Sequence, residues 1–198
     1  MEGRDRVGQE QVSLSHEGHK YTTVNGEDRP PLHLILETAN LINTRFYRPE
    51  HASRGITVHE LTALLDRGLI ALEDIDPEYQ GYCEGWLQFK EDFKPEIIDI
   101  EKSVGHRIYK YACTPDRTGI INNKNAIIDI KSGLPEKWHG AQLVAQAIAT
   151  GLTDATLYGV YLKKTGKYKK YKPLTYKYRD HYNAWMAALT IYQYKQGE

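Results

Sequence analysis

The chain contains very little cysteine: its 198 residues include two, Cys83 and Cys113. Two thiols cannot supply the four thiolates of an iron–sulfur cluster or of a four-cysteine structural zinc site. A disulfide framework is not expected either, because domains that depend on disulfides are dense in cysteine. We therefore expect reduced, partly buried cysteines and no iron–sulfur cluster.

The sequence also lacks a long apolar run. No stretch approaches the roughly 18–20 apolar residues that a membrane-spanning helix needs. The first eleven residues, MEGRDRVGQEQ, are polar and lack the apolar core of a signal peptide. These absences predict a cytoplasmic protein without a membrane partner, located in the host cytoplasm if the protein is viral.

An excess of charge of one sign is absent as well, since 26 basic and 26 acidic residues balance. Net charge therefore does not indicate a nucleic-acid-binding protein. The charges are unevenly spread, however, and the stretch GKYKKYKPLTYKYRDHY (residues 166–182) mixes cations with aromatic rings. Such a stretch can bind phosphates and stack unpaired bases, or can be an exposed pair of strands packed over its own tyrosines. The candidate DNA-binding residues are Lys167, Lys169, Lys170 and Lys172.

Length and composition fit one globular α/β domain. The chain is 40% hydrophobic and 26% charged, and it is long enough to bury a core. No repeat, linker or low-complexity segment divides it, so we expect a flexible N-terminus at residues 1–10 and a single domain at residues 11–198. Periodicity and turn signals predict the elements. Helices are expected at 32–42, 57–66, from 76 to before Pro95, at 138–150 and at 179–194. Strands are expected twice within 11–24 and at 97–104, 107–113, 116–121, 126–131, 155–162 and 168–171, with a hairpin turn at 122–125.

The segment TPDRTGIINNKNAIIDIKSG (residues 114–133) carries the chemistry. Side chains alternate along a strand, so Asp129 and Lys131 point the same way while Ile128 and Ile130 point into the core. A hairpin between Thr118 and Asp129 brings Asp116 beside them. The expected result is two carboxylates and one ammonium group at the end of a strand pair.

This combination suits phosphodiester hydrolysis. Two neighbouring carboxylates repel each other unless a divalent cation lies between them, and oxygen ligands favour Mg²⁺ or Mn²⁺. Such an ion acidifies an attacking water and stabilises charge on the phosphate. Lys131 is placed to orient that water or to stabilise the transition state, and the backbone carbonyl of Ile130 is a further candidate ligand. An Asp-x-Lys on a strand is by itself more often a solvated edge or a salt bridge, but here it follows a buried apolar run.

The pattern Pro115-Asp116 followed by Asp129-Ile130-Lys131 resembles the PD-(D/E)xK nuclease superfamily. The context is similar to its RecB-like branch, which includes Cas4-type proteins and phage recombination exonucleases. GITVH (residues 55–59) matches the Gly-x-x-x-His helix that precedes the core in that branch, and QLVAQ (residues 142–146) matches the start of its Gln-x-x-x-Tyr helix. The likeness extends from about residue 21 to residue 194 and implies a central mixed β-sheet flanked by helices.

The resemblance also implies roles for single residues. His59 would be a metal ligand with Asp116 and Asp129, and Lys131 would be the catalytic lysine. Gln142 would position the DNA or a group of the active site. Glu101 would be an additional ligand or a partner of the ligands. Alone, His59, Gln142 and Glu101 would each be an ordinary surface, boundary or salt-bridge residue.

Two positions depart from the family pattern. Cys113 stands where the family usually has glycine, and Gln146 replaces the aromatic residue expected four positions after Gln142. Neither change removes an expected metal ligand, so they put the positioning of DNA in doubt and not the chemistry. The absence of cluster-binding cysteines favours the phage exonucleases over the Cas4-type proteins.

The resulting hypothesis is a Mg²⁺-dependent deoxyribonuclease, an exonuclease that resects DNA ends for recombination or repair in a phage-like context. The family likeness further implies DNA as substrate, a homo-oligomer, and a single-strand annealing or recombination protein as partner. Two alternatives remain open. One is a catalytically silent DNA-end-binding protein or inhibitor on the same fold, and the other is an endonuclease.

Overall fold

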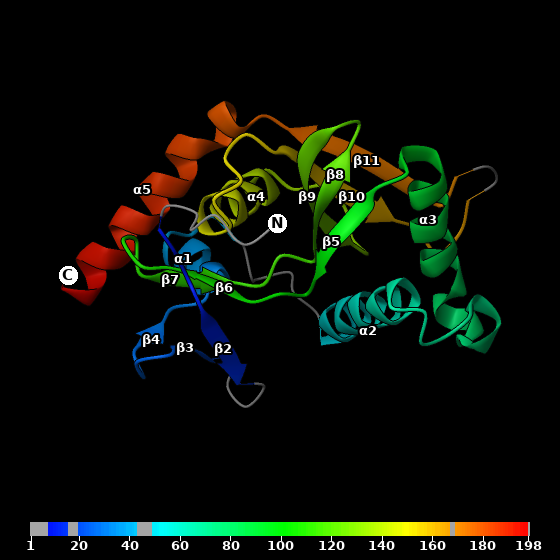
Figure 1. Cartoon of the computed structure of the whole chain (residues 1–198), viewed down its shortest axis with the longest axis horizontal. Coiled ribbons are helices and arrows are strands. Elements are labelled where there is room, and N and C mark those ends of the chain that lie inside the picture. The colour runs from blue at the N-terminus through cyan, green and yellow to red at the C-terminus, as the bar shows by residue number, and fades with distance from the viewer. Residues whose placement is uncertain (1–7, 16–19, 43–48, 167–168, 198) are drawn as a thin grey trace.

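The computed structural model describes residues 8–15, 20–42, 49–166 and 169–197, and the chain is built around one five-stranded sheet (Figure 1). Across the sheet the strand order is β11-β10-β9-β8-β5. Strands β9 and β10 run parallel, and the other neighbouring pairs run antiparallel. The central mixed sheet predicted from the sequence is confirmed. Its strands are β5 (Glu96–Ile100), β8 (Arg117–Ile121), β9 (Lys124–Lys131), β10 (Thr156–Leu162) and β11 (Tyr171–Tyr176).

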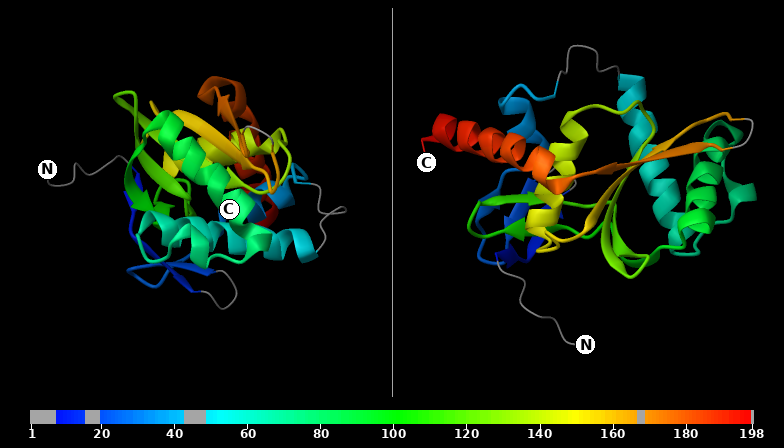
Figure 2. Two further views of the ribbon diagram at one scale, coloured as in Figure 1. Left: turned by 90° about the vertical axis from the view of Figure 1, so that its right-hand side faces the viewer. Right: turned by 90° about the horizontal axis from the view of Figure 1, so that it is seen from above.

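Helices cover both faces of this sheet (Figures 1 and 2). Helix α4 connects the parallel strands and packs with α1 and α5 in one hydrophobic cluster, whereas α3 packs on the other face, with α2 beside it. No helix in the described ranges is both long and apolar enough to cross a membrane. The helices are α1 (Leu32–Thr38), α2 (Pro49–Asp66), a 3₁₀ turn (Leu72–Asp74), α3 (Pro77–Phe93), α4 (Trp138–Ala149) and α5 (Tyr178–Gln196).

Strand β9 is buried on both faces, as expected for a strand beside a parallel neighbour. Ile127 belongs to the cluster with α4, whereas Ile128 and Ile130 belong to the cluster with α3. Asp129 lies on the Ile127 face and is fully buried. The sequence correctly predicted that Ile128 and Ile130 lie in the core. It did not predict that Asp129 faces a second part of the core.

Two small sheets lie beside the central one. The first consists of β1 (Gln9–Glu10), β6 (Val104–His106) and β7 (Tyr111–Cys113), and the second of β2 (Val12–Ser15), β3 (Lys20–Thr23) and β4 (Asp28–Arg29). Gln9 and Glu10 were expected in the flexible N-terminus. They form a strand because they pair with β6 and because Glu10 contacts Arg29 at 2.6 Å. Residues 1–7 lie outside the described part of the chain.

Several element boundaries differ from the predictions. Helix α2 begins at Pro49 and not at Thr57, so Gly55 lies inside it. The strand expected at 97–104 ends at Ile100, because Glu101 turns the chain with a φ of 51°. Residues 107–110 form a turn in which the Tyr109 N–H donates to Nδ1 of His106 at 3.1 Å. The last strand occupies 171–176 instead of 168–171.

Candidate active site

The ends of several sheet strands meet at one edge of the central sheet. Ile100, at the end of β5, pairs with Arg117 at the start of β8, and Arg117 pairs in turn with Ile128 near the end of β9. Glu101, Asp116 and Lys131 therefore come from the same edge. Helix α2 brings His59 to this edge from outside the sheet.

His59, Glu101 and Asp116 form one cluster. Nδ1 of His59 lies 3.2 Å from Oδ1 of Asp116 and 3.9 Å from Oε1 of Glu101. One nitrogen or carboxylate oxygen from each of the three residues lies within 4.8 Å of the others. The second oxygen of Asp116 accepts a 2.6 Å hydrogen bond from the Ile130 N–H, which fixes the orientation of the carboxylate. One imidazole and two carboxylates are a donor set that suits a divalent cation with oxygen and nitrogen ligands.

Asp129, Lys131 and Gln142 form a second cluster next to the first. Nζ of Lys131 lies 2.7 Å from Oδ2 of Asp129 and donates to Oε1 of Gln142 at 3.1 Å. Nε2 of Gln142 donates to the other oxygen of Asp129 at 2.9 Å. The ammonium group and the glutamine amide thus hold a fully buried carboxylate in one orientation.

The ionisable groups of the two clusters influence one another. Burial by itself lowers the pKa of His59, but the charge and hydrogen bond of Asp116 and the hydrogen bond of Glu101 outweigh it and raise this pKa to about 10. Burial disfavours ionised Asp116, yet the charge of His59 outweighs that effect, so its pKa is lowered. Burial raises the pKa of Asp129, Lys131 opposes this rise, and the charge of Asp116 adds to it. Two buried carboxylates that repel each other are the setting in which a bound cation is stabilising.

A buried arginine ties the first cluster to the helices. Arg117 is fully buried, and its guanidinium donates to the Asp116 carbonyl at 2.6 Å and to Oε1 of Glu101 at 3.3 Å. Its Nε contacts Oδ2 of Asp66, at the end of α2, at 2.7 Å. Trp86 and Lys90 of α3 also donate to Asp66. Arg117 was not among the residues predicted from the sequence. Its position, as a charged residue at the start of an apolar strand directly after Asp116, could have indicated it.

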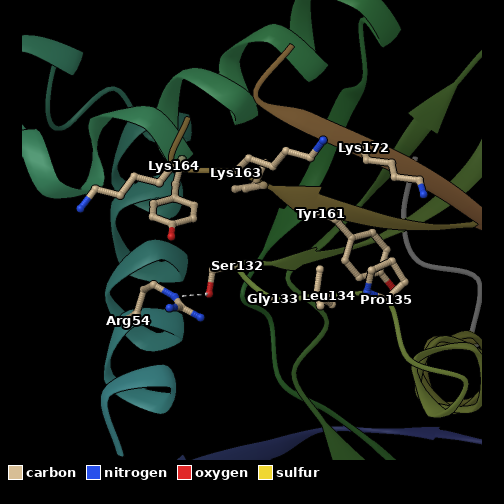
Figure 3. Close-up of a pocket in the computed structure, with 11 residues that line it drawn as sticks. Arg54, Ser132, Gly133, Leu134, Pro135, Tyr161, Lys163, Lys164 and Lys172 are labelled. Atoms are coloured by element: carbon tan, nitrogen blue, oxygen red, sulfur yellow. Dashed lines mark hydrogen bonds between the residues drawn. The ribbon is translucent and has the colours of Figure 1, made fainter. Parts of the chain in front are cut away.

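A pocket adjoins the second cluster (Figure 3). Its volume is about 460 Å³. Arg54 of α2 lies on one side and donates to Ser132 at 3.4 Å, and the lysines at the end of β10 and the start of β11 lie on another side. The lining residues are Arg54, Tyr82, Ser132, Gly133, Leu134, Pro135, Tyr161, Leu162, Lys163, Lys164 and Lys172.

Among the four lysines expected to bind DNA, Lys172 lines this pocket. Lys169 and Lys170 instead form ion pairs with α3, Lys169 with Asp92 at 2.6 Å and Lys170 with Glu84. Lys167 lies outside the described residues. Lys163 and Lys164 line the pocket too, although they were not among the candidates, and their place directly after β10 was the signal available in the sequence.

No family model and no curated protein matches the sequence. Among solved structures, the chain is similar to an alkaline exonuclease, LHK-Exo, from Laribacter hongkongensis. The identity is 15% and the TM-score 0.39, over 82% of this chain and 91% of that chain. For LHK-Exo in complex with dAMP, the identity is 12% and the TM-score 0.37, over 85% and 92% of the two chains. These TM-scores describe a distant likeness of fold and say nothing about the activity of this chain.

Proposed function

We propose that the protein is a metal-dependent deoxyribonuclease of the PD-(D/E)xK type. The observation that carries this proposal is that two clusters adjoin at one sheet edge, where the N–H of Ile130, between Asp129 and Lys131, donates to Asp116. His59, Glu101 and Asp116 supply a donor set for a cation, and Asp129, Lys131 and Gln142 supply an oriented carboxylate and ammonium group beside it. The first cluster combines residues that are far apart in the sequence, and the second combines the end of β9 with helix α4.

The donor set supports Mg²⁺ or Mn²⁺ as the cofactor. His59, Glu101 and Asp116 would hold the ion, with Asp129 and the Ile130 carbonyl as further candidate ligands. The ion would supply acidification of a water molecule and neutralisation of charge on the phosphate. A neutral imidazole is needed for ligation, so His59, with its pKa raised to about 10, would have to give up its proton to hold the ion.

The protein's own groups position the ligands and act on the substrate. The Ile130 N–H holds Asp116 in place. Lys131 is 17% exposed in its side chain, whereas Asp129 is fully buried, so the ammonium group is the member of this pair that a substrate can reach. Lys131 orients the attacking water or stabilises negative charge on the phosphate in the transition state. Gln142 holds the Lys131 and Asp129 side chains in fixed positions by a hydrogen bond to each.

The finer proposal is an exonuclease that resects DNA ends for recombination or repair. The similarity of the motifs to phage recombination exonucleases supports it, and that similarity also underlies the proposed homo-oligomer, recombination partner and cytoplasmic location. A catalytically silent DNA-end-binding protein on the same fold is the second candidate, because the site could bind metal and DNA without turnover.

The test is digestion of end-labelled linear DNA with Mg²⁺ or Mn²⁺, comparing the wild type with Lys131→Ala. We expect progressive shortening by the wild type and at least about 100-fold slower cleavage by the variant, the scale found when one transition-state donor is lost. Lys124→Ala, at the opposite end of β9, serves as the control and should cleave normally. Intact DNA with every protein would refute the proposal and favour the silent binding protein, and cleavage of closed circular DNA would indicate an endonuclease.

A further inference from the structure

The pocket of Figure 3 lies next to the second cluster. Ser132, Gly133 and Leu134 follow Lys131 directly in the chain, and Tyr161 of β10 is the parallel-strand neighbour of Lys131. The pocket therefore lies outside the carboxyl ends of the two parallel strands, the usual place for ligands in open α/β sheets. A strand of nucleic acid with one phosphate at Lys131 would reach this pocket with its next nucleotide.

Cations surround the pocket. Arg54, Lys163, Lys164 and Lys172 line it from α2, from the end of β10 and from the start of β11. Lys163 and Lys172 are exposed and have no carboxylate within ion-pair distance in the described residues, and Lys164 is 3.7 Å from Glu78. Positive charge held in a concave site without a protein counter-ion attracts a phosphate.

Apart from Ser132 and Gly133, the rest of the lining is apolar and aromatic. Leu134 is 83% exposed, and Pro135 and Tyr161 line the pocket with it. Tyr82 of α3 and Leu162 of β10 also line the pocket but are buried, so Leu134 and Pro135 offer most of its exposed apolar surface. Apolar and aromatic side chains with a few polar groups are typical of small-ligand pockets, which measure roughly 300–1,000 Å³. The pocket thus combines a surface for a nucleobase with cations for its phosphate.

We propose that this pocket is a subsite for one unpaired nucleotide of the DNA strand, next to the phosphate that is cleaved. The link to cleavage rests on the proposed function, whereas binding of the nucleotide does not. A base inside a duplex is paired and stacked, and extracting it costs a few kcal/mol. DNA with a single-stranded end is therefore the preferred ligand over blunt duplex.

The first arm of the test measures binding by fluorescence anisotropy of a labelled single-stranded oligonucleotide in EDTA, where cleavage cannot occur. The double variant Lys163→Ala/Lys172→Ala should raise Kd about tenfold and reduce the slope of log K against log salt by about 1.4, the value for two phosphate contacts on a single strand. The double variant Lys94→Ala/Lys124→Ala removes the same charge away from the pocket and should leave both quantities unchanged. Equal Kd and slope for the two double variants would overturn the proposal.

The second arm tests the nucleobase. Leu134→Ala should weaken binding of an ordinary single strand about fivefold, at the lower end of base-stacking contributions, and leave binding of an abasic strand unchanged. Equal weakening of both strands, or tighter binding of blunt duplex than of single strands by the wild type, would contradict a nucleotide subsite. A protein that binds as expected but never cleaves DNA would refute the proposed function and leave this subsite standing.

Discussion

Asp116 and Asp129 are both buried carboxylates, yet their surroundings differ. Asp116 contacts His59 and the Ile130 N–H, whereas Asp129 contacts Lys131 and Gln142. The pKa of Asp116 is lowered and that of Asp129 is raised. Environments that separate two carboxylates in this way are typical of sites where each has its own task.

Asp116→Asn should abolish metal binding while keeping an oxygen that can accept from the Ile130 N–H. A ligand that binds the folded state stabilises it by about 2.7 kcal/mol at a concentration 100-fold above its Kd. We expect Mn²⁺ to raise the Tm of the wild type and of the control Asp154→Asn, and to leave that of Asp116→Asn unchanged. Differential scanning fluorimetry measures all three, and an equal rise in the Asp116→Asn variant would argue against the ligand role of Asp116.

At the scale of elements, the buried carboxylate of Asp66 joins α2, α3 and β8. Asp66 ends α2, Trp86 and Lys90 reach it from α3, and Arg117 reaches it from β8. Because Arg117 also contacts Glu101 and the Asp116 carbonyl, the packing of the helices determines where two candidate metal ligands lie.

Asp66→Asn should destabilise the protein by about 3–5 kcal/mol, the usual cost of leaving one partner of a buried pair uncompensated. Urea unfolding measures this change, with Asp180→Asn on the exposed start of α5 as the control. The variant should also bind Mn²⁺ more weakly, because Arg117 is released from α2. A change below about 1 kcal/mol would show that Arg117 does not depend on Asp66.

Gly81 and Gly85 allow α3 to approach the segments that follow β10 and precede β11. A Cβ atom at Gly85 would overlap the carbonyl of Lys170, and one at Gly81 would overlap the carbonyl of Lys164. Gly85→Ala should cost about 1–3 kcal/mol in unfolding free energy through overpacking. The matched control is Gly55→Ala in α2, where a Cβ has room and should add about 0.5–1 kcal/mol of stability. Urea unfolding measures both variants. If the two substitutions changed the free energy of unfolding in the same direction, the expected difference would be contradicted.

The parts of the fold that local signals determine were predictable. Asn122 and Asn123 have φ values of 50° and 60°, as a tight hairpin turn between β8 and β9 requires, and the structure confirms this turn. Asp76 caps α3 by accepting from the Glu78 N–H, as its sequence pattern predicts. The start of α2 was missed because Gly55 is a weak helix former, and its position inside α2 could not be read from periodicity.

The candidate site was predictable residue by residue but not as an arrangement. The sequence indicated His59, Asp116, Asp129, Lys131 and Gln142, and these residues do meet at one sheet edge. It did not separate them into two clusters, because that division depends on which helix faces each side of β9. The buried contacts of Arg117 were not predictable either, since ion pairs between distant elements leave no local pattern.

At the scale of the whole molecule, one buried histidine couples folding to pH. Burial lowers the pKa of His139 to about 3, and its Nδ1 accepts from the Glu136 N–H at 3.2 Å, as a neutral ring does. The unfolded chain has an ordinary histidine pKa near 6.5. Between pH 6.5 and pH 3 the unfolded state therefore binds more protons, so stability falls as the pH falls through this window.

His139 should contribute a slope of up to about 1.4 kcal/mol per pH unit to the free energy of unfolding below pH 6.5. His139→Gln removes the titrating ring, so its stability should depend less on pH in this range even if it is lower at pH 7. Urea unfolding of both proteins at several pH values between about 4 and 7 measures the slopes. Parallel slopes would mean that His139 is not the group responsible.

The two cysteines have a practical consequence. Cys83 and Cys113 are buried, and burial raises both thiol pKa values, that of Cys83 to about 11. Thiolates are the reactive form, so maleimide reagents will scarcely label either residue at neutral pH. A Leu134→Cys substitution would add an exposed thiol at the mouth of the pocket without any need to remove the native ones. A fluorophore attached there would report nucleotide binding to the proposed subsite, at the weaker affinity expected once the Leu134 side chain is removed.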